Sequence, residues 1–273
     1  MKTGWATIVA AVPLVLAVPV LVLVTFVLAL HAQDSSPQWK DPSAHTTRFV
    51  TVDKNVELEV LDWGGPGRSM ILLAGGGQTA HLFDDFAPKL AARWHVYGIT
   101  RRGYGASGYL PTDNPANRLD DNVVAVIDTL KINKPILVGH SVAGAELSSV
   151  AYRHPDRIAG LVYLDAAYSY AFDNGKGFEV REIQKLRRLA LPQPGPADLA
   201  SFSALGKYYE RLLGVQFPEP ELRQEWESDV SGRVIRQRDP PGAVMVASLI
   251  TTPAKYTNIP VPALVIFANP TLG

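Results

Sequence analysis

Apolar runs of strand length alternate with stretches of helical spacing from Met70 onward. The unbroken apolar run at 70–74 is typical of a strand buried on both faces, and further strands are predicted at 94–99, 135–138 and 157–165. Between them, spacing and composition predict helices at 81–92, 117–130 and 142–152. Two alternating runs before Met70, at 48–52 and 56–61, predict a hairpin. The pattern specifies an α/β fold with a doubly wound, mostly parallel sheet.

The pattern changes between residues 168 and 242. This stretch has a Pro/Gly-rich break at 191–196, no evident strand, and helical spacing at 180–191, 199–213 and 220–230. We interpret it as a helical cap inserted over the active edge of the sheet. The alternative is a set of solvated surface helices. A helix at 243–255 and a last strand at 261–268 return the chain to the sheet.

The N-terminus predicts a membrane-inserting segment. No charged residue occurs from Thr3 to Gln33, and residues 5–30 are apolar almost throughout, which exceeds the ~20 residues needed to cross a bilayer. Lys2 before this run and Asp34 after it favour a transmembrane helix with the remainder of the chain extracytoplasmic. An uncleaved anchor is favoured; the alternative is secretion after signal cleavage near Ala32.

Five segments are therefore expected. They are a membrane anchor or signal at 1–32, a tether at 33–46, the first part of the core at 47–167, the cap at 168–242, and the final helix and strand of an incomplete core at 243–273.

Composition excludes several classes of function. The 273 residues carry a formal net charge of zero without a basic stripe, so we expect no nucleic-acid partner. The absence of cysteine excludes a disulfide framework and a thiolate metal site. We expect neither a metal nor a cofactor. The glycine pattern at 103–108 precedes a proline rather than a helix, so it does not predict a dinucleotide site.

The candidate chemistry centres on Ser141. The sequence 135–144 reads as a strand, a Gly-His-Ser turn and a helix, the context of a nucleophile elbow. Small residues at Gly139 and Ala143 leave room for a strained turn, and the helix that starts at Val142 would direct free N–H groups toward an oxyanion. The alternative is that Ser141 only caps this helix.

Two more features follow predicted strands at the same edge. Gly75, Gly76 and Gly77 come directly after the strand at 70–74, and Asp165 ends the strand at 157–165. Three glycines allow the backbone to approach a ligand and to direct N–H groups into a cleft. Sites of parallel sheets form at the carboxyl ends of the strands, so we expect these features and Ser141 to lie together.

The order of motifs resembles the α/β-hydrolase superfamily from about residue 47 onward: LLAGGG, RRGYGASG, GHSVAG, a cap and PALVIF. The resemblance implies that Ser141 is the nucleophile and that the N–H groups of Val142 and Gly76, with Gly77 as second choice, form the oxyanion hole. A serine there, rather than aspartate, argues against epoxide-hydrolase and haloalkane-dehalogenase chemistry and favours acyl transfer through a covalent ester.

The sequence departs from the family at the catalytic histidine and the acid. The family histidine follows one further strand, and this sequence has no histidine after His154. Of those present, His81 is the nearest stand-in base. Asp165 is the candidate acid, with a strand-end cap as the alternative; other members use the loop after the next strand, which here begins with Asn269. We favour truncation over a degenerate, non-catalytic chain, because the motifs of the elbow and of the glycine loop are intact.

The sequence therefore predicts a membrane-anchored serine hydrolase that acts on a small acyl substrate such as an ester. The missing histidine places the activity of this particular chain in doubt. The alternative is a non-catalytic member that binds a small ligand or protein under its cap. A serine-dependent lyase or carbon–carbon hydrolase would share the same motifs.

Overall fold

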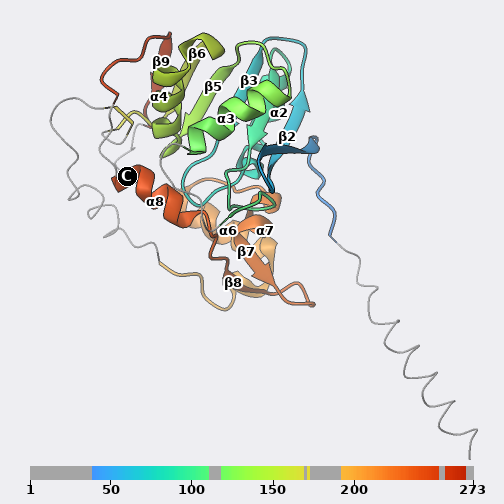
Figure 1. Ribbon diagram of the computed structural model, residues 1–273. Coiled ribbons are helices and arrows are strands. Elements are labelled where there is room, and N and C mark those ends of the chain that lie inside the picture. Colours follow the sequence, from blue (N-terminus) through green and yellow to red (C-terminus); the bar gives the residue numbers. More distant parts are fainter. Residues whose placement is uncertain (1–38, 111–117, 169–170, 173–191, 252–255, 269–273) are drawn as a thin grey trace, which may run out of the picture. The chain divides into compact units, whose positions relative to one another are not determined.

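The computed structural model describes residues 39–110, 118–168, 171–172, 192–251 and 256–268 (Figure 1). The chain divides into two compact units, Met1–Asp41 and Pro42–Gly273, and the fold belongs to the second. The expected anchor at 1–32 and most of the expected tether lie outside the described residues. In the described ranges, no helix combines the length and apolarity that a bilayer crossing requires.

The described residues form a seven-stranded sheet in the order β1-β2-β4-β3-β5-β6-β9. The strands β1 and β2 make the predicted antiparallel hairpin, and β2 also runs antiparallel to β4; the other neighbours are parallel. The mostly parallel sheet is thus confirmed. The strands are β1 (Thr46–Asp53), β2 (Val56–Gly64), β3 (Ser69–Leu73), β4 (His95–Ile99), β5 (Ile136–His140), β6 (Gly160–Leu164) and β9 (Ala263–Ile266).

Helices cover both faces of this sheet. Successive strand residues point to opposite faces, so Ile71 belongs to the core cluster that contains residues of α3 (Arg118–Thr129) and α4 (Ala143–Arg153). Leu72 belongs to the opposite cluster, with residues of η2 (Ala80–Phe83) and α2 (Ala87–Ala91). The continuous helix predicted at 81–92 is wrong, because a 3₁₀ turn and a separate short helix with proline in its first turn replace it.

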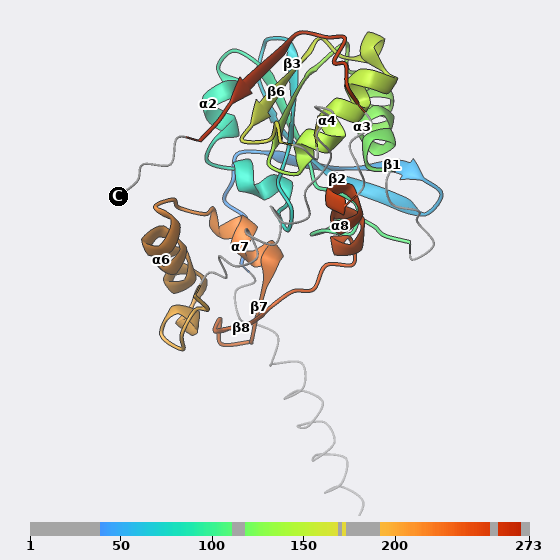
Figure 2. The ribbon, with the colours of Figure 1, turned by 90° about the vertical axis from the view of Figure 1, so that its left-hand side faces the viewer.

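The expected cap region contains strands as well as helices. After η4 (Asp198–Ala200) and α6 (Phe202–Leu213), the helix α7 (Glu219–Glu225) leads into a hairpin of β7 (Trp226–Ser228) and β8 (Val234–Gln237). These elements gather beyond one end of the sheet (Figure 2). The helix predicted at 220–230 ends early, because Trp226 is extended and pairs with Gln237 of β8. Asp229 forms the turn of this hairpin by accepting backbone N–H bonds from Ser231 and Arg233. The helix predicted at 180–191 lies outside the described residues.

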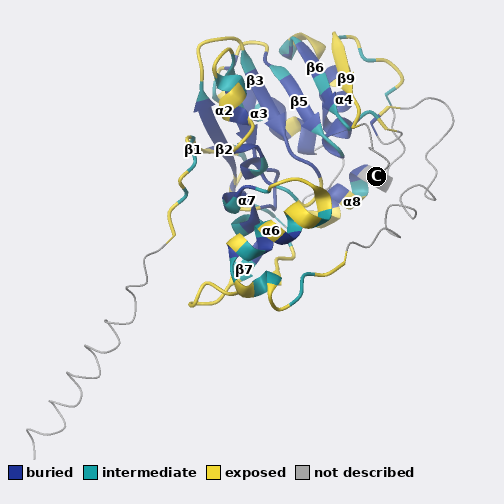
Figure 3. Ribbon diagram, turned by 180° about the vertical axis from the view of Figure 1, so that it is seen from behind, coloured by how far each residue is buried: buried dark blue, intermediate teal, exposed yellow. Residues whose placement is uncertain are grey.

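The helix α8 (Ala243–Thr251) and strand β9 return the chain to the sheet. The strand pairs in parallel with β6, as expected for a last core strand. Figure 3 shows β9 exposed beside buried central strands. Leu264 and Ile266 are 55% and 48% exposed, so this strand presents apolar side chains to solvent.

Candidate functional site

Ser141 lies on a strained turn between β5 and α4. Its φ of +52° is unusual for a residue with a side chain. The Ser141 N–H donates to the Leu164 carbonyl on β6 at 3.2 Å, and the Ser141 carbonyl accepts from the Gly144 N–H at 2.9 Å. Val142 is the N-cap of α4, and no side-chain hydrogen bond caps this helix. The predicted strand–turn–helix is present, and the interpretation of Ser141 as a helix cap is wrong.

Small residues around Ser141 have a steric cause. A Cβ on Gly139 would lie 2.9 Å from the Leu147 side chain and 3.1 Å from the Ala143 Cβ. A Cβ on Gly144 would lie 1.9 Å from the Ala166 carbonyl oxygen, a backbone atom that cannot easily move. The turn and the start of α4 therefore pack too closely on β6 and its following loop for larger residues.

The glycine loop after β3 lies against this turn. A Cβ on Gly76 would stand 3.5 Å from Val142 Cγ1 and 3.3 Å from Val246 Cγ1 of α8. Gly77 is engaged elsewhere, since its backbone hydrogen-bonds Tyr104. The structure thus brings together Gly76 and Val142, the two residues whose N–H groups the sequence predicts as an oxyanion hole, and favours Gly76 over Gly77.

Asp165 follows β6 at the same edge of the sheet. Its φ is +49°, and its N–H donates to the Ile266 carbonyl at 2.7 Å. Its carboxylate accepts a hydrogen bond of 2.5 Å from the Tyr168 hydroxyl, which raises the pKa of Tyr168 to about 12. Burial lowers the pKa of His140, and the nearby Asp165 charge opposes this effect because it favours the protonated ring. A carboxylate therefore lies near the turn, half-buried.

His81 is held between two carboxylates. Its Nδ1 lies 3.0 Å from Asp84 Oδ2, and its Nε2 lies 3.5 Å from Glu59 Oε1. Burial opposes the charged ring, but the hydrogen bonds to Asp84 and Glu59 outweigh it and raise the pKa of His81 to about 10. A ring that is protonated on both nitrogens has no lone pair to accept a proton. This geometry argues against His81 as a stand-in base.

None of the other described histidines is hydrogen-bonded to Ser141, and two of them are paired with carboxylates. His95 Nε2 lies 2.9 Å from Asp62 Oδ1, and His45 Nδ1 lies 2.8 Å from Asp84 Oδ1. His154 follows the far end of α4. His140 packs against Gly75, and its buried Nδ1 has no hydrogen-bond partner in the described part of the chain. No hydrogen bond joins a described histidine to Ser141.

His45, His81 and Asp84 also present metal-ligand types within 4.8 Å of one another. Each of the two rings directs its Nδ1 at the Asp84 carboxylate. Burial raises the pKa of Asp84, but the two histidines lower it by more. The net pKa of Asp84 is below its usual value, so the group stays ionised. The two histidines and Asp84 thus form a hydrogen-bond network around the Asp84 carboxylate.

The cap region is fastened to the glycine loop. Glu221 of α7 is fully buried and accepts hydrogen bonds from the Thr79 N–H, at 2.9 Å, and from the Thr79 hydroxyl. A cavity of about 430 Å³ lies beside this contact. It is bounded by Gly77 and Tyr104 from the core and by Glu225, Arg236 and neighbouring residues from the cap. The cap and the core therefore line a cavity next to the candidate oxyanion loop.

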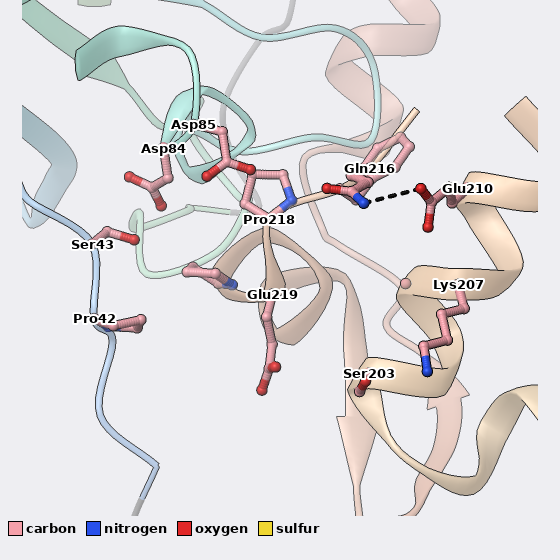
Figure 4. A pocket seen from close by; sticks show the side chains of 13 residues that line it. Pro42, Ser43, Asp84, Asp85, Ser203, Lys207, Glu210, Gln216, Pro218 and Glu219 are labelled. Atoms are coloured by element: carbon pink, nitrogen blue, oxygen red, sulfur yellow. Dashed lines mark hydrogen bonds between the residues drawn. The ribbon is translucent and has the colours of Figure 1, made fainter. Parts of the chain in front are cut away.

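A second cavity, of about 500 Å³, lies between α6, α7 and the core residues Asp84 and Asp85. Figure 4 shows its polar lining, including the hydrogen bond from Gln216 to Glu210. Its lining includes neither Ser141 nor the glycine loop. It is thus a separate feature of the cap–core boundary.

Sequence reasoning missed a buried ion pair between Arg101 and Glu146. Arg101 follows β4 by two residues, and Glu146 lies in the first turn of α4. The side chains are 5% and 3% exposed. The pairing of two charges 45 residues apart leaves no periodic signal. The signal available was an arginine doublet at the end of a strand, where a buried charge needs a partner.

The comparisons with known proteins show which family the chain belongs to. The model of the "Alpha/beta hydrolase family" matches residues 70–272. Fluoroacetate dehalogenase from Burkholderia sp is 30% identical over 176 residues, 60% of this chain and 57% of that protein. Pimeloyl-[acyl-carrier protein] methyl ester esterase from Neisseria meningitidis is 34% identical over 95 residues, 34% of this chain and 35% of that protein.

A solved structure shows the same fold over most of the chain. E-2-(acetamidomethylene)succinate hydrolase superposes with a TM-score of 0.60 at 21% identity, covering 81% of this chain and 80% of that one. The chain spans less than two thirds of the length of the curated relatives it matches. The family model nevertheless covers well over half of the sequence, so the chain belongs to the alpha/beta hydrolase family.

Proposed function

We propose that this protein is a serine hydrolase that cleaves an ester or similar acyl bond of a small molecule, with Ser141 as nucleophile. One observation carries the proposal: Ser141 is strained at φ +52° beside Val142, and the glycine loop packs Gly76 against that same Val142. The methyl ester esterase among the relatives supports acyl chemistry.

The proposed reaction has two steps. The Ser141 Oγ attacks the acyl carbon, a C–O bond forms, and the alcohol leaves with a proton; water then cleaves the Ser141 ester. The oxyanion of each tetrahedral intermediate accepts hydrogen bonds from the Gly76 and Val142 N–H groups, helped by the dipole of α4. Each such donor contributes on the order of 10²–10³ in rate.

The proton transfers need a base, and among the described residues no histidine is hydrogen-bonded to Ser141. Asp165 lies at the same sheet edge and would orient a histidine, but His45, His81 and His95 are each paired with other carboxylates. Loss of such a base costs several orders of magnitude. We therefore propose that the 273-residue chain turns over slowly, as an elbow and oxyanion hole without their histidine.

The alternative is a non-catalytic member that binds a small ligand under its cap. The cavity of about 430 Å³ beside Gly77 favours it, since a pocket enclosed by core and cap can hold a ligand without catalysis. A serine-dependent lyase or carbon–carbon hydrolase would use the same residues. The dehalogenase relative acts on a different bond class by its name, and the Ser141 side chain favours acyl transfer over that chemistry.

The test is hydrolysis of p-nitrophenyl butyrate by the full-length chain in mild detergent. We expect slow release of p-nitrophenol that Ser141→Ala abolishes. The matched control is Ser203→Ala, which removes an exposed serine of α6 and should keep the wild-type rate. Equal rates for the wild-type and Ser141→Ala proteins would refute the proposal. Ligand-induced stabilisation without any turnover would support the binding alternative.

We also propose, from the sequence, that residues 1–32 anchor the protein with its hydrolase domain extracytoplasmic. The support is the uncharged apolar stretch flanked by Lys2 and Asp34. Carbonate extraction of membranes from cells that express the full chain tests anchoring, and protease protection in spheroplasts tests the side. Release into the carbonate supernatant would contradict anchoring.

A further inference from the structure

The Arg101 guanidinium joins the glycine loop to the helix that follows Ser141. Its Nη2 donates to the Ala74 carbonyl at 2.8 Å, and its Nη1 donates to the Gly75 carbonyl at 3.1 Å. Its Nε lies 3.2 Å from both oxygens of Glu146 on α4, and Nη2 also donates to that carboxylate. The group is thus held from both sides.

The contact to the Gly75 carbonyl fixes the direction of the next N–H. All described peptide bonds are trans, and in a trans peptide the carbonyl and the following N–H point in opposite directions. The Gly75 carbonyl points inward, at a guanidinium that is 6% exposed. The Gly76 N–H therefore points away from Arg101, toward the exposed side of the loop.

This peptide needs an anchor because glycines flank it. Gly75 and Gly76 both lack a Cβ, so rotation of the plane between them meets little steric resistance. A Cβ on Gly75 would lie 2.8 Å from Gln78 Oε1 and 3.0 Å from His140 Nδ1, so a larger residue there would require both side chains to shift. The loop's own bond to this carbonyl, from the Gln78 N–H, is long at 3.5 Å.

We propose that Arg101, itself oriented by Glu146, is a positioning residue that holds the Gly75–Gly76 peptide with its N–H toward the oxyanion. This inference rests on the proposed function and extends it. Arg101 touches no substrate atom in this role; it acts through the Gly76 N–H.

The test uses a double variant that preserves packing. Removing one charge would leave the other buried and unpaired, which is strongly destabilising, whereas replacing both with apolar groups of similar size is often neutral. Arg101→Met/Glu146→Leu therefore removes the anchor without leaving a buried unpaired charge, and its melting temperature is measured beside that of the wild-type protein. Arg157→Gln is the control, because it breaks an exposed pair with Asp128 that does not contact the loop.

The first readout is the rate at which a fluorescent alkyl phosphonate labels Ser141 in the full-length chain. The proposal expects labelling to fall about 100-fold in the double variant, since one oxyanion donor is misplaced, and to stay unchanged in Arg157→Gln. A merely structural role predicts that a double variant with the wild-type melting temperature labels at the wild-type rate. That result would overturn the inference.

The second readout does not depend on activity. Crystal structures of the wild-type and double-variant proteins would show the Gly75–Gly76 peptide directly. The inference expects this peptide to be reversed, or in two orientations, in the double variant; a single wild-type orientation would overturn it. If the wild-type protein is not labelled at all, the proposed function fails, while the peptide orientation still decides the role of Arg101.

Discussion

Raising the pH should deprotonate His81 only under strongly alkaline conditions. Its ring lies between Asp84 and Glu59, and its pKa is about 10 against an ordinary value of 6.5. The folded pKa is the higher one, so the protonated ring stabilises the fold fully below pH 6.5. That contribution is lost as the pH rises from 6.5 through 10.

The size of this contribution follows from the same values. A difference of 3.5 pKa units, at about 1.4 kcal/mol each, gives at most about 5 kcal/mol. The His81 side chain is 5% exposed, so solvent screens it little. Loss of about 5 kcal/mol is comparable to the whole stability of many domains. We expect marked loss of stability between pH 7 and 10.

Two measurements check this reasoning on the full-length chain. Ring ¹⁵N NMR should show His81 protonated on both nitrogens at pH 8, and urea unfolding should give a free energy that falls between pH 7 and 10. His81→Gln should be less stable at pH 6 and lose less with rising pH. The matched variant His95→Gln, at a half-buried ring paired with Asp62, should keep the wild-type slope.

A neutral His81 ring at pH 8, with one free nitrogen, would refute this reasoning. It would also restore His81 as a candidate base, because the geometric argument against that role depends on both nitrogens being protonated. Parallel stability curves for the wild-type and His81→Gln proteins would contradict it independently.

Three further predictions concern single positions. Gly144→Ala should lower the free energy of unfolding by about 1–3 kcal/mol, because its Cβ would lie 1.9 Å from the Ala166 carbonyl oxygen. Thermal unfolding measures this, with Gly206→Ala as control, because a Cβ there would lie 3.6 Å from the Leu222 side chain. Burial, and after it the neighbouring Glu221, raises the pKa of Glu225 above its ordinary value of 4.5. The folded state therefore holds this proton more tightly than the unfolded chain does, and the free energy of unfolding falls as the pH rises above 4.5. Glu225→Gln should therefore flatten the fall in unfolding free energy between pH 7 and 9, and an unchanged slope would contradict this cause. Asp165→Asn should lower the pKa of Tyr168 from about 12 toward 10, as read from tyrosinate absorbance against a Tyr168→Phe background, because the carboxylate acceptor is lost.

The parts of the site that were predictable from the sequence are local in the chain. The turn at Ser141 needs small residues within three positions on either side, so its motif carries the geometry. Gly76 and Asp165 were predictable because parallel strands bring their carboxyl ends to one edge. The hairpin of β7 and β8 was missed, since its turn depends on the side chain of Asp229, and helical spacing continues across it.

Long-range charge pairs were not predictable by the same means. Arg101 and Glu146 meet because β4 and α4 converge, and nothing near either residue specifies the partner. His81 was the nearest candidate stand-in base in the sequence because its contact with Glu59, which lies on strand β2, leaves no local pattern. Glu221 joins the cap to Thr79 across 142 residues. Such contacts depend on how the elements pack, which periodicity does not determine.

The most direct test of the central claim is intact-mass analysis of the full-length chain after incubation with a fluorescent alkyl phosphonate. The account predicts one adduct per chain, located on Ser141 by peptide mapping and absent from Ser141→Ala. A folded wild-type protein that forms no adduct, or forms it at another residue, would contradict the claim that this turn is a nucleophile elbow.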